Sequence, residues 1–172
     1  FNELKNRLEG LDDEQRMDIL ADFIKEHENE EYGCYNDIYK YTQFLDKYEY
    51  KFELMKSFGD DESINKVKEY CPEDKIEMIA KIIEGHNENE KLNLIIDFVR
   101  EYEKKEYIRA YYDRGASPSY IRYTNIDKYI KLLKNYDDKL ELAQTTDNFD
   151  IAEKILVEYP FNNEERNKYE RL

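Results

Sequence analysis

Hydrophobic side chains recur along this chain at the spacing of an α-helix. Positions i, i+3, i+4 and i+7 of one stripe hold Leu20, Phe23, Ile24 and His27. A second stripe continues over several helical turns through Tyr41, Leu45, Tyr48, Phe52 and Met55. Such stripes are typical of amphipathic helices that bury one face and leave charged residues on the other.

Few residues interrupt these patterns. The 172 residues include 5 Gly and 3 Pro, which favours helices joined by short loops over a β-sandwich. We therefore predict an all-α fold. The predicted helix N-caps are Asp12, Asp61, Asn87, Thr124 and Asn148, and the predicted helix ends are at Gly10, Gly59 and Gly85. The predicted helices are Asn2–Glu9, Asp13–Glu31, Tyr35–Met55, Glu62–Tyr70, Glu73–Glu84, Glu88–Tyr112, Asn125–Gln144 and Phe149–Tyr159.

The two halves of the chain repeat the same residues in the same order. Over residues 9–32 and 84–107 the offset is 75, with identical pairs such as Gly10/Gly85, Phe23/Phe98 and Tyr32/Tyr107. Further along the offset becomes 88, with the pairs Tyr41/Tyr129, Leu45/Leu133 and Tyr48/Tyr136. Because two registered blocks rarely arise by chance, we interpret them as a tandem duplication.

Each copy is predicted to hold four helices. Repeat one covers about 1–71, repeat two about 72–160, and residues 161–172 resemble the first helix of a third unit. One helical hairpin cannot bury its apolar stripe alone, so neighbouring units have to cover it. We therefore expect a single helical-repeat domain over residues 1–172, in which two four-helix units stack as a short α-solenoid.

One segment resembles a known helical repeat. Residues 147–160 are similar to the second half of a tetratricopeptide-like hairpin, with Phe149 and Ala152 where that family has an aromatic and a small residue at the helix crossing. The match covers this hairpin alone: its helix ends at Pro160, and the tryptophan and glycine signature of the family is missing elsewhere. The resemblance implies an α-solenoid and no particular partner.

Composition narrows the class of protein. With 41 acidic and 27 basic residues, the net charge is −14, which argues against direct binding to nucleic-acid phosphates. No apolar run reaches the roughly 18–20 residues of a membrane span, so no membrane association is expected. The cysteines, Cys34 and Cys71, and the histidines, His27 and His86, are too few for a disulfide scaffold or a zinc site. Free thiols favour a reducing location, cytoplasmic or otherwise intracellular, which includes delivery into a host cell.

The second copy is 13 residues longer than the first, because the offset rises from 75 to 88 between Tyr107 and Lys128. Gly115 and Pro118 predict a protruding loop in this basic, tyrosine-rich segment. Arg and Tyr are enriched at binding hot spots, so the candidate partner-binding residues are Arg109, Tyr111, Tyr112, Arg114, Tyr120, Arg122 and Tyr123.

A structural interpretation of this segment carries equal weight. The arginines would neutralise neighbouring acidic helices, and the tyrosines would cover one end of the core. On the binding hypothesis, alanine at Arg109, Arg114 and Arg122 weakens partner capture with little change in melting temperature.

Acidic clusters at 27–31, 60–62, 86–90 and 137–138 form a second candidate surface. They could steer a basic partner towards the protein. The favoured interpretation is that they are solvated helix faces that keep the chain soluble.

Motifs for chemistry are absent from the sequence. It contains no HExxH, calcium-loop, GxxxxGK[ST], GxGxxG or GxSxG pattern, so we predict no enzymatic activity, no cofactor and no metal. The predicted function is a protein–protein interaction module or scaffold, alone or within a larger repeat array. The alternative is a small acidic inhibitor or effector, such as an anti-defence, immunity or host-targeting protein, that blocks a basic groove. Binding by acidic mimicry would weaken with salt more than binding centred on tyrosine.

Overall fold

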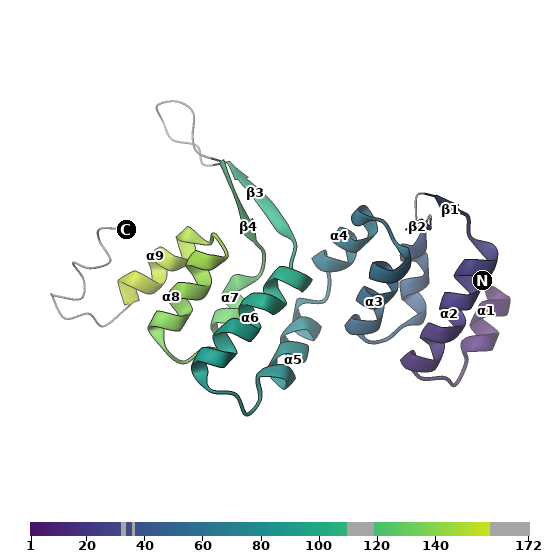
Figure 1. The fold of residues 1–172 in the computed structure, drawn as a ribbon, viewed down its shortest axis with the longest axis horizontal. Helices are drawn as coiled ribbons and strands as arrows, with labels where there is room; N and C mark the ends of the chain where they lie inside the picture. Colours follow the sequence, from purple (N-terminus) through teal and green to yellow (C-terminus); the bar gives the residue numbers. More distant parts are fainter. Residues whose placement is uncertain (32–33, 36, 110–118, 159–172) are drawn as a thin grey trace. The chain divides into compact units, whose positions relative to one another are not determined.

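The computed structural model describes residues 1–31, 34–35, 37–109 and 119–158, and most of them are helical (Figure 1). The predicted all-α character is confirmed at this level, with a few short strands added. The chain divides into two compact units, Phe1–Lys81 and Ile82–Leu172. The division falls within helix α5 (Pro72–Ile83). Residues 161–172, where a third unit is predicted, lie outside the described residues.

Unit 1 alternates helices with one small hairpin. Its elements before α5 are α1 (Asn2–Leu8), α2 (Asp13–His27), β1 (Glu30–Glu31), β2 (Cys34–Tyr35), the 3₁₀ helix η1 (Ile38–Phe44), α3 (Tyr48–Phe58) and α4 (Asp61–Glu69). Unit 2 follows the same order with a longer hairpin (Figure 1). Its elements are α6 (Glu88–Tyr102), β3 (Lys105–Arg109), β4 (Ser119–Tyr123), α7 (Ile126–Ile130), α8 (Tyr136–Thr145) and α9 (Phe149–Glu158).

The long helix of each unit begins at its predicted N-cap, which the structure shows to be part of a capping box. Asp12 accepts a hydrogen bond from the Gln15 amide at 2.9 Å, and Asn87 accepts one from the Glu90 amide at 3.0 Å. In both boxes the side chain of the third helical residue, Gln15 or Glu90, accepts a hydrogen bond from the backbone amide of the cap residue. These bonds satisfy amides that have no partner inside the helix, which fixes where α2 and α6 start.

The helix predicted for Tyr35–Met55 is interrupted, so this sequence prediction is wrong. η1 and α3 are separate elements, and the Asp13 carboxylate of α2 lies at the break between them. It accepts hydrogen bonds from the backbone amides of Asp46 at 3.0 Å and Lys47 at 2.7 Å. Asp13 is 6 % exposed, so a buried side chain replaces the helical partners that these amides would otherwise need.

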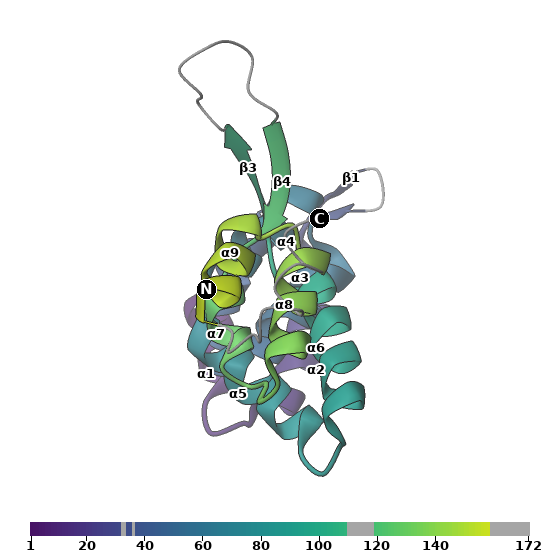
Figure 2. The ribbon, with the colours of Figure 1, turned by 90° about the vertical axis from the view of Figure 1, so that its left-hand side faces the viewer.

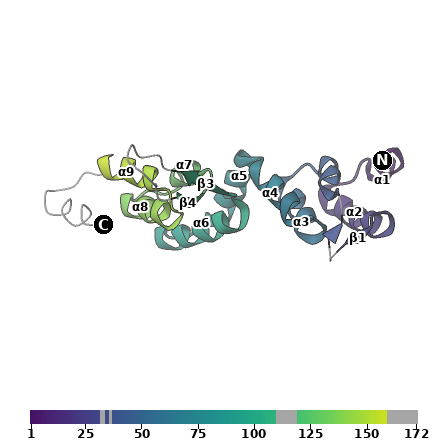
Figure 3. The ribbon, with the colours of Figure 1, turned by 90° about the horizontal axis from the view of Figure 1, so that it is seen from above.

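Unit 2 has a corresponding break in the helix predicted for Asn125–Gln144. Here the Glu88 carboxylate of α6 accepts a hydrogen bond from the Lys134 amide at 3.3 Å, between α7 and α8. α8 then packs on α9, and Figure 3 shows the two helices side by side. Their shared core contains Leu140, Ala143, Ala152 and Ile155.

A buried tyrosine ties the long helix of each unit to the element after the hairpin. In unit 1 the Tyr41 hydroxyl donates to Glu28, which follows α2. In unit 2 the Tyr129 hydroxyl donates to Glu103, which follows α6, at 2.6 Å. Both tyrosines are at most 1 % exposed. Their rings each lie 6.1 Å from a phenylalanine ring of the long helix, Phe23 and Phe98 respectively.

The prediction that a helix runs from Glu88 to Tyr112 is also wrong, because α6 ends at Tyr102. The next residue, Glu103, is 2 % exposed and accepts hydrogen bonds from Thr124 Oγ1 and Asn125 Nδ2, both at 2.9 Å. This contact turns the chain out of the helix and starts β3. Its partners lie more than 20 residues away, so the local pattern of Glu88–Tyr112 does not reveal them.

Candidate functional site

The candidate surface predicted from the sequence falls on the hairpin of β3 and β4, which stands out from the helices of unit 2 (Figure 2). The strands pair antiparallel, with Glu106 opposite Arg122 and Tyr107 opposite Ile121. Because side chains alternate along a strand, these two pairs lie on opposite faces of the hairpin. We call the face with Glu106 and Arg122 the inner face, since it contacts α9.

Ion pairs hold the inner face to α9. Arg122 Nε lies 2.7 Å from Glu106 Oε1, and its Nη1 lies 2.8 Å from Asp150 Oδ1. Burial lowers the pKa of the Arg122 guanidinium, but the two carboxylates outweigh it and raise that pKa above the usual value. Next to this pair, the Tyr120 ring meets the Phe149 ring edge-on at 5.5 Å.

The base of the hairpin is fixed to the connection between α8 and α9. The Tyr123 amide donates to the Thr146 carbonyl at 3.2 Å, and Asn148 Nδ2 donates to the Tyr123 carbonyl at 3.1 Å. Thr146 and Asn148 are 1 % and 3 % exposed. This end of β4 is therefore held by buried polar groups, which are costly to leave without partners.

The outer face of the hairpin, formed by Lys105, Tyr107, Ile121 and Tyr123, contrasts with the inner one. Tyr107 is 60 % exposed and its cross-strand neighbour Ile121 is 52 % exposed. The Lys105 ammonium lies 5.0 Å from the centre of the Tyr123 ring, which is within cation–π range. Two adjacent large apolar side chains thus face solvent on a hairpin whose other side is anchored.

The structure separates the seven predicted binding residues into groups. Tyr120 and Arg122 pack against α9, as the structural interpretation expects, and Tyr123 is anchored through its backbone. Arg109 is the last residue of β3. The remaining three, Tyr111, Tyr112 and Arg114, lie outside the described residues.

Sequence reasoning missed Lys105, Tyr107 and Ile121 as surface residues. A signal for them existed, because 105–109 and 119–123 each contain a Tyr-Ile pair, and Gly115 and Pro118 lie between the two segments in the sequence. This signal, aromatic and β-branched residues on either side of turn-forming residues, is typical of a hairpin. It was obscured by the helical stripe of α6, which continues into the same segment.

Several acidic residues of the predicted second surface have structural roles. Asp60, and not the predicted Asp61, caps α4 by accepting from the Ser63 amide at 2.8 Å. Glu28 forms an ion pair with Lys40 at 2.7 Å. Burial raises the pKa of Glu28, but the bonds from Lys40 and a tyrosine hydroxyl outweigh it and lower that pKa below the usual value.

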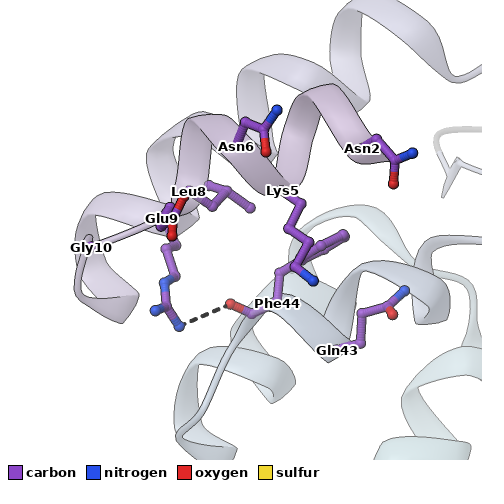
Figure 4. Close-up of a pocket in the computed structure, with 9 residues that line it drawn as sticks. Asn2, Lys5, Asn6, Leu8, Glu9, Gly10, Gln43 and Phe44 are labelled. Carbon is purple, nitrogen blue, oxygen red and sulfur yellow. Dashed lines mark hydrogen bonds between the residues drawn. The ribbon is translucent and has the colours of Figure 1, made fainter.

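An open cavity of about 770 Å³ lies between α1 and η1 in unit 1. Figure 4 shows Lys5, Asn6 and Gln43 around it, with a hydrogen bond to the Phe44 carbonyl. The donor of that bond is Arg16, which also pairs with the Asp46 carboxylate at 2.9 Å. None of the described lining residues is His, Cys or Ser, so the cavity offers no nucleophile of those types.

A second hollow of about 480 Å³ lies beside η1, α3 and α4, and Tyr39, Tyr70 and Cys71 line it. Both cysteines are free, as predicted. Burial and the nearby Asp74 carboxylate raise the pKa of the Cys71 thiol, so it is protonated at neutral pH. A protonated thiol is a poor nucleophile, which argues against cysteine chemistry here.

Metal ligands, membrane spans and similarity to known proteins give no functional assignment. Over the described ranges, no cluster of three His, Cys, Asp or Glu side chains could hold a metal ion. The helices described are each too short or too polar to cross a bilayer. Comparison with protein-family models, curated proteins and solved structures finds no match.

Proposed function

We propose that this chain is a non-enzymatic protein–protein interaction module whose contact surface is the outer face of the β3–β4 hairpin. The observation that carries the proposal is the exposed pair Tyr107 and Ile121, opposite each other on a hairpin anchored by Arg122. Tyrosine is enriched at binding hot spots, and adjacent exposed apolar side chains mark interaction sites more often than isolated ones. Arg109, Tyr111, Tyr112 and Arg114 remain proposed contacts.

Anchoring makes the outer face suited to binding. A surface that is already ordered loses little conformational entropy when a partner binds. The ion pairs of Arg122 and the buried bonds of Asn148 supply this order, so Tyr107 and Ile121 are presented on a fixed support. Arg122 and Tyr120 then act as supports for the contact surface.

We further propose that the module arose by tandem duplication of a four-helix unit and that the units form a short α-solenoid. The support is the common order of elements and the matching contacts: the capping boxes, the buried Tyr–Glu bonds, and the carboxylates of Asp13 and Glu88 at equivalent breaks. The units differ most in hairpin length. Added length in one copy of a repeat is where a specific binding function would be placed.

Affinity capture from the native cell tests the proposed function. The bait is the full chain, compared with the variant Tyr107→Ser/Ile121→Ser and the control Val157→Ser, which changes an 81 % exposed apolar residue of α9. We expect the double variant to lose a protein that wild type and control both retain, with unchanged circular dichroism. Retention of every captured protein by the double variant would contradict the proposal. If high salt abolishes capture and the double variant captures as much as wild type at low salt, the acidic-inhibitor alternative is favoured instead.

A further inference from the structure

The hydrogen-bond register of the hairpin shows which backbone groups point away from it. The Thr124 amide donates to the Lys104 carbonyl at 3.0 Å, and this pair continues the register of β3 and β4. In an antiparallel ladder, bonded and non-bonded pairs alternate. Glu106 and Arg122 therefore form a bonded pair, whereas Tyr107 and Ile121 form a non-bonded pair. The amide and carbonyl of Tyr107 consequently point outward from the edge of β3.

The two edges of this two-stranded sheet differ. On the β4 edge, both outward groups of Tyr123 are occupied, by the Thr146 carbonyl and the Asn148 side chain. On the β3 edge, Lys105 and Tyr107 have no backbone hydrogen-bond partner among the described residues beyond the hairpin. Ile121 on β4 has none there either, but its edge is closed at the next outward position, Tyr123. An unpaired edge is a template for another strand. The edge that is open at both outward positions is thus that of β3.

We infer that β3 binds an extended segment of a partner protein by strand addition, with an acidic residue paired to Lys105 and an apolar residue paired to Tyr107. This inference rests on the proposed function and names the kind of partner. An added strand would form backbone bonds with the outward groups of Tyr107. Its side chains on the outer face would meet the Lys105 ammonium and the exposed Tyr107 ring, so opposite charge and apolar surface are favoured at those two positions.

A second copy of the chain fits this edge less well. Antiparallel pairing of two β3 strands about Tyr107 would pair Lys105 with Arg109 of the other copy, and like-charged residues in cross-strand pairs are destabilising. Each copy also carries a net charge of −14. The net charge of the whole chain has little effect on a short acidic segment at this edge, because salt screens charges more than about 8 Å away at physiological ionic strength. Glu106, the acid between Lys105 and Tyr107 in the sequence, is paired with Arg122 on the inner face.

The first test uses the wild-type chain and synthetic heptapeptides. The probe is the palindromic peptide Thr-Glu-Thr-Val-Thr-Glu-Thr, labelled for fluorescence anisotropy, and its control has Lys in place of Glu. We expect the acidic peptide to bind about tenfold more tightly, an effect of about 1.4 kcal/mol, because Lys in place of Glu exchanges an attractive cross-strand pair with Lys105 for a repulsive one. Equal binding of the two peptides, or no binding of either, would overturn the inference.

Backbone methylation separates strand addition from adhesion of side chains. N-methyl groups on Val and Glu of the acidic peptide block the amides that would face β3, whereas N-methyl groups on the inner Thr residues leave them free. Binding should fall at least about tenfold for the first peptide and much less for the second, since only the first loses bonds to the edge. Equal loss in both peptides would refute strand addition.

Variants of the protein give an independent comparison. Tyr107→Pro removes the outward amide without removing a bond of the β3–β4 ladder, and Tyr107→Thr removes the same ring but keeps the amide. We expect the proline variant to bind the acidic peptide more weakly than the threonine variant. If the two variants bind the peptide equally while Tyr107→Ser/Ile121→Ser still reduces partner capture, the edge inference is refuted and the proposed function stands. If the wild-type chain is a dimer in solution and Tyr107→Pro makes it monomeric, the strand that pairs with β3 comes from a second copy, and the inferred partner is wrong.

Discussion

Glu103 is the residue on which the base of the hairpin depends most directly. Its carboxylate is 2 % exposed and accepts hydrogen bonds from Tyr129 Oη, Thr124 Oγ1 and Asn125 Nδ2 at 2.6, 2.9 and 2.9 Å. These donors come from β4's end and from α7, so one side chain joins α6, the hairpin and the following helix. We predict that Glu103→Ala destabilises unit 2 strongly.

The magnitude follows from the three donors. A buried donor left without an acceptor costs about 1–3 kcal/mol, and the Tyr129 hydroxyl is such a donor. Thr124 and Asn125 are partly exposed, and Thr124 Oγ1 keeps the Lys104 carbonyl as an acceptor at 3.1 Å. We therefore expect a loss of about 2–4 kcal/mol for Glu103→Ala. Glu103→Gln should lose only about 1 kcal/mol, because the amide oxygen can still accept from Thr124 and Asn125 while the Tyr129 hydroxyl rotates to accept from the amide. Glu153→Gln on α9 is the exposed control, expected within about 0.5 kcal/mol of wild type.

Urea denaturation followed by far-UV circular dichroism measures these free energies, because the chain has no Trp for fluorescence. Amide hydrogen exchange at Thr124, whose amide bonds to Lys104, reports whether the hairpin base opens. A loss as large for Gln as for Ala would show that charge, and not the supply of acceptors, dominates. A loss below about 1 kcal/mol for Glu103→Ala would refute the reasoning.

Three further predictions concern contacts that the structure adds to the sequence. Arg122→Ala should lower the free energy of unfolding by about 1–3 kcal/mol. The control Arg100→Ala, whose side chain is 54 % exposed, should lower it by less than about 0.5 kcal/mol. Equal urea midpoints for the two variants would contradict this prediction. Asp13→Ala should cost about 2–3 kcal/mol and speed amide exchange at the start of α3, and unchanged exchange there would count against its capping role. The folded-state pKa of Glu28 lies below its usual 4.5, so its stabilisation is present above about pH 4.5 and lost as pH falls through the folded pKa. The stability deficit of Glu28→Gln should therefore shrink in acid, and a deficit independent of pH would refute this.

The prediction for Arg122 changes the expectation drawn from the sequence. On the binding hypothesis, alanine at Arg109, Arg114 and Arg122 was expected to change the melting temperature little. Arg122 instead bridges two carboxylates at 2.7 and 2.8 Å. A loss of partner capture in that triple variant would therefore mix lost contacts with lost support. The pair Tyr107→Ser/Ile121→Ser avoids this ambiguity, since both side chains are more than half exposed.

The sequence placed the candidate site in the segment that forms the β3–β4 hairpin, and the structure shows which of the described side chains in that segment face solvent. The change in offset between the two halves marked the longer hairpin, because an insertion is visible in a linear comparison. Which of its side chains face solvent depends on the pairing of β3 with β4 and on the position of α9. Neither is contained in the local pattern, so the sequence left the role of Arg122 open and did not indicate that Tyr107 is exposed.

By itself, the sequence determined the amphipathic helices, the N-caps at Asp12 and Asn87, and the helix ends at Gly10 and Gly85. These features depend on residues within one or two turns of one another. Tertiary structure decided where the long helical patterns break and which hairpin face is exposed. The deciding partners, such as Asp13 for the Lys47 amide and Glu103 for Thr124, are separated from their targets by 34 and 21 residues. A buried carboxylate stabilises whichever backbone groups the fold brings to it, and local periodicity does not specify those groups.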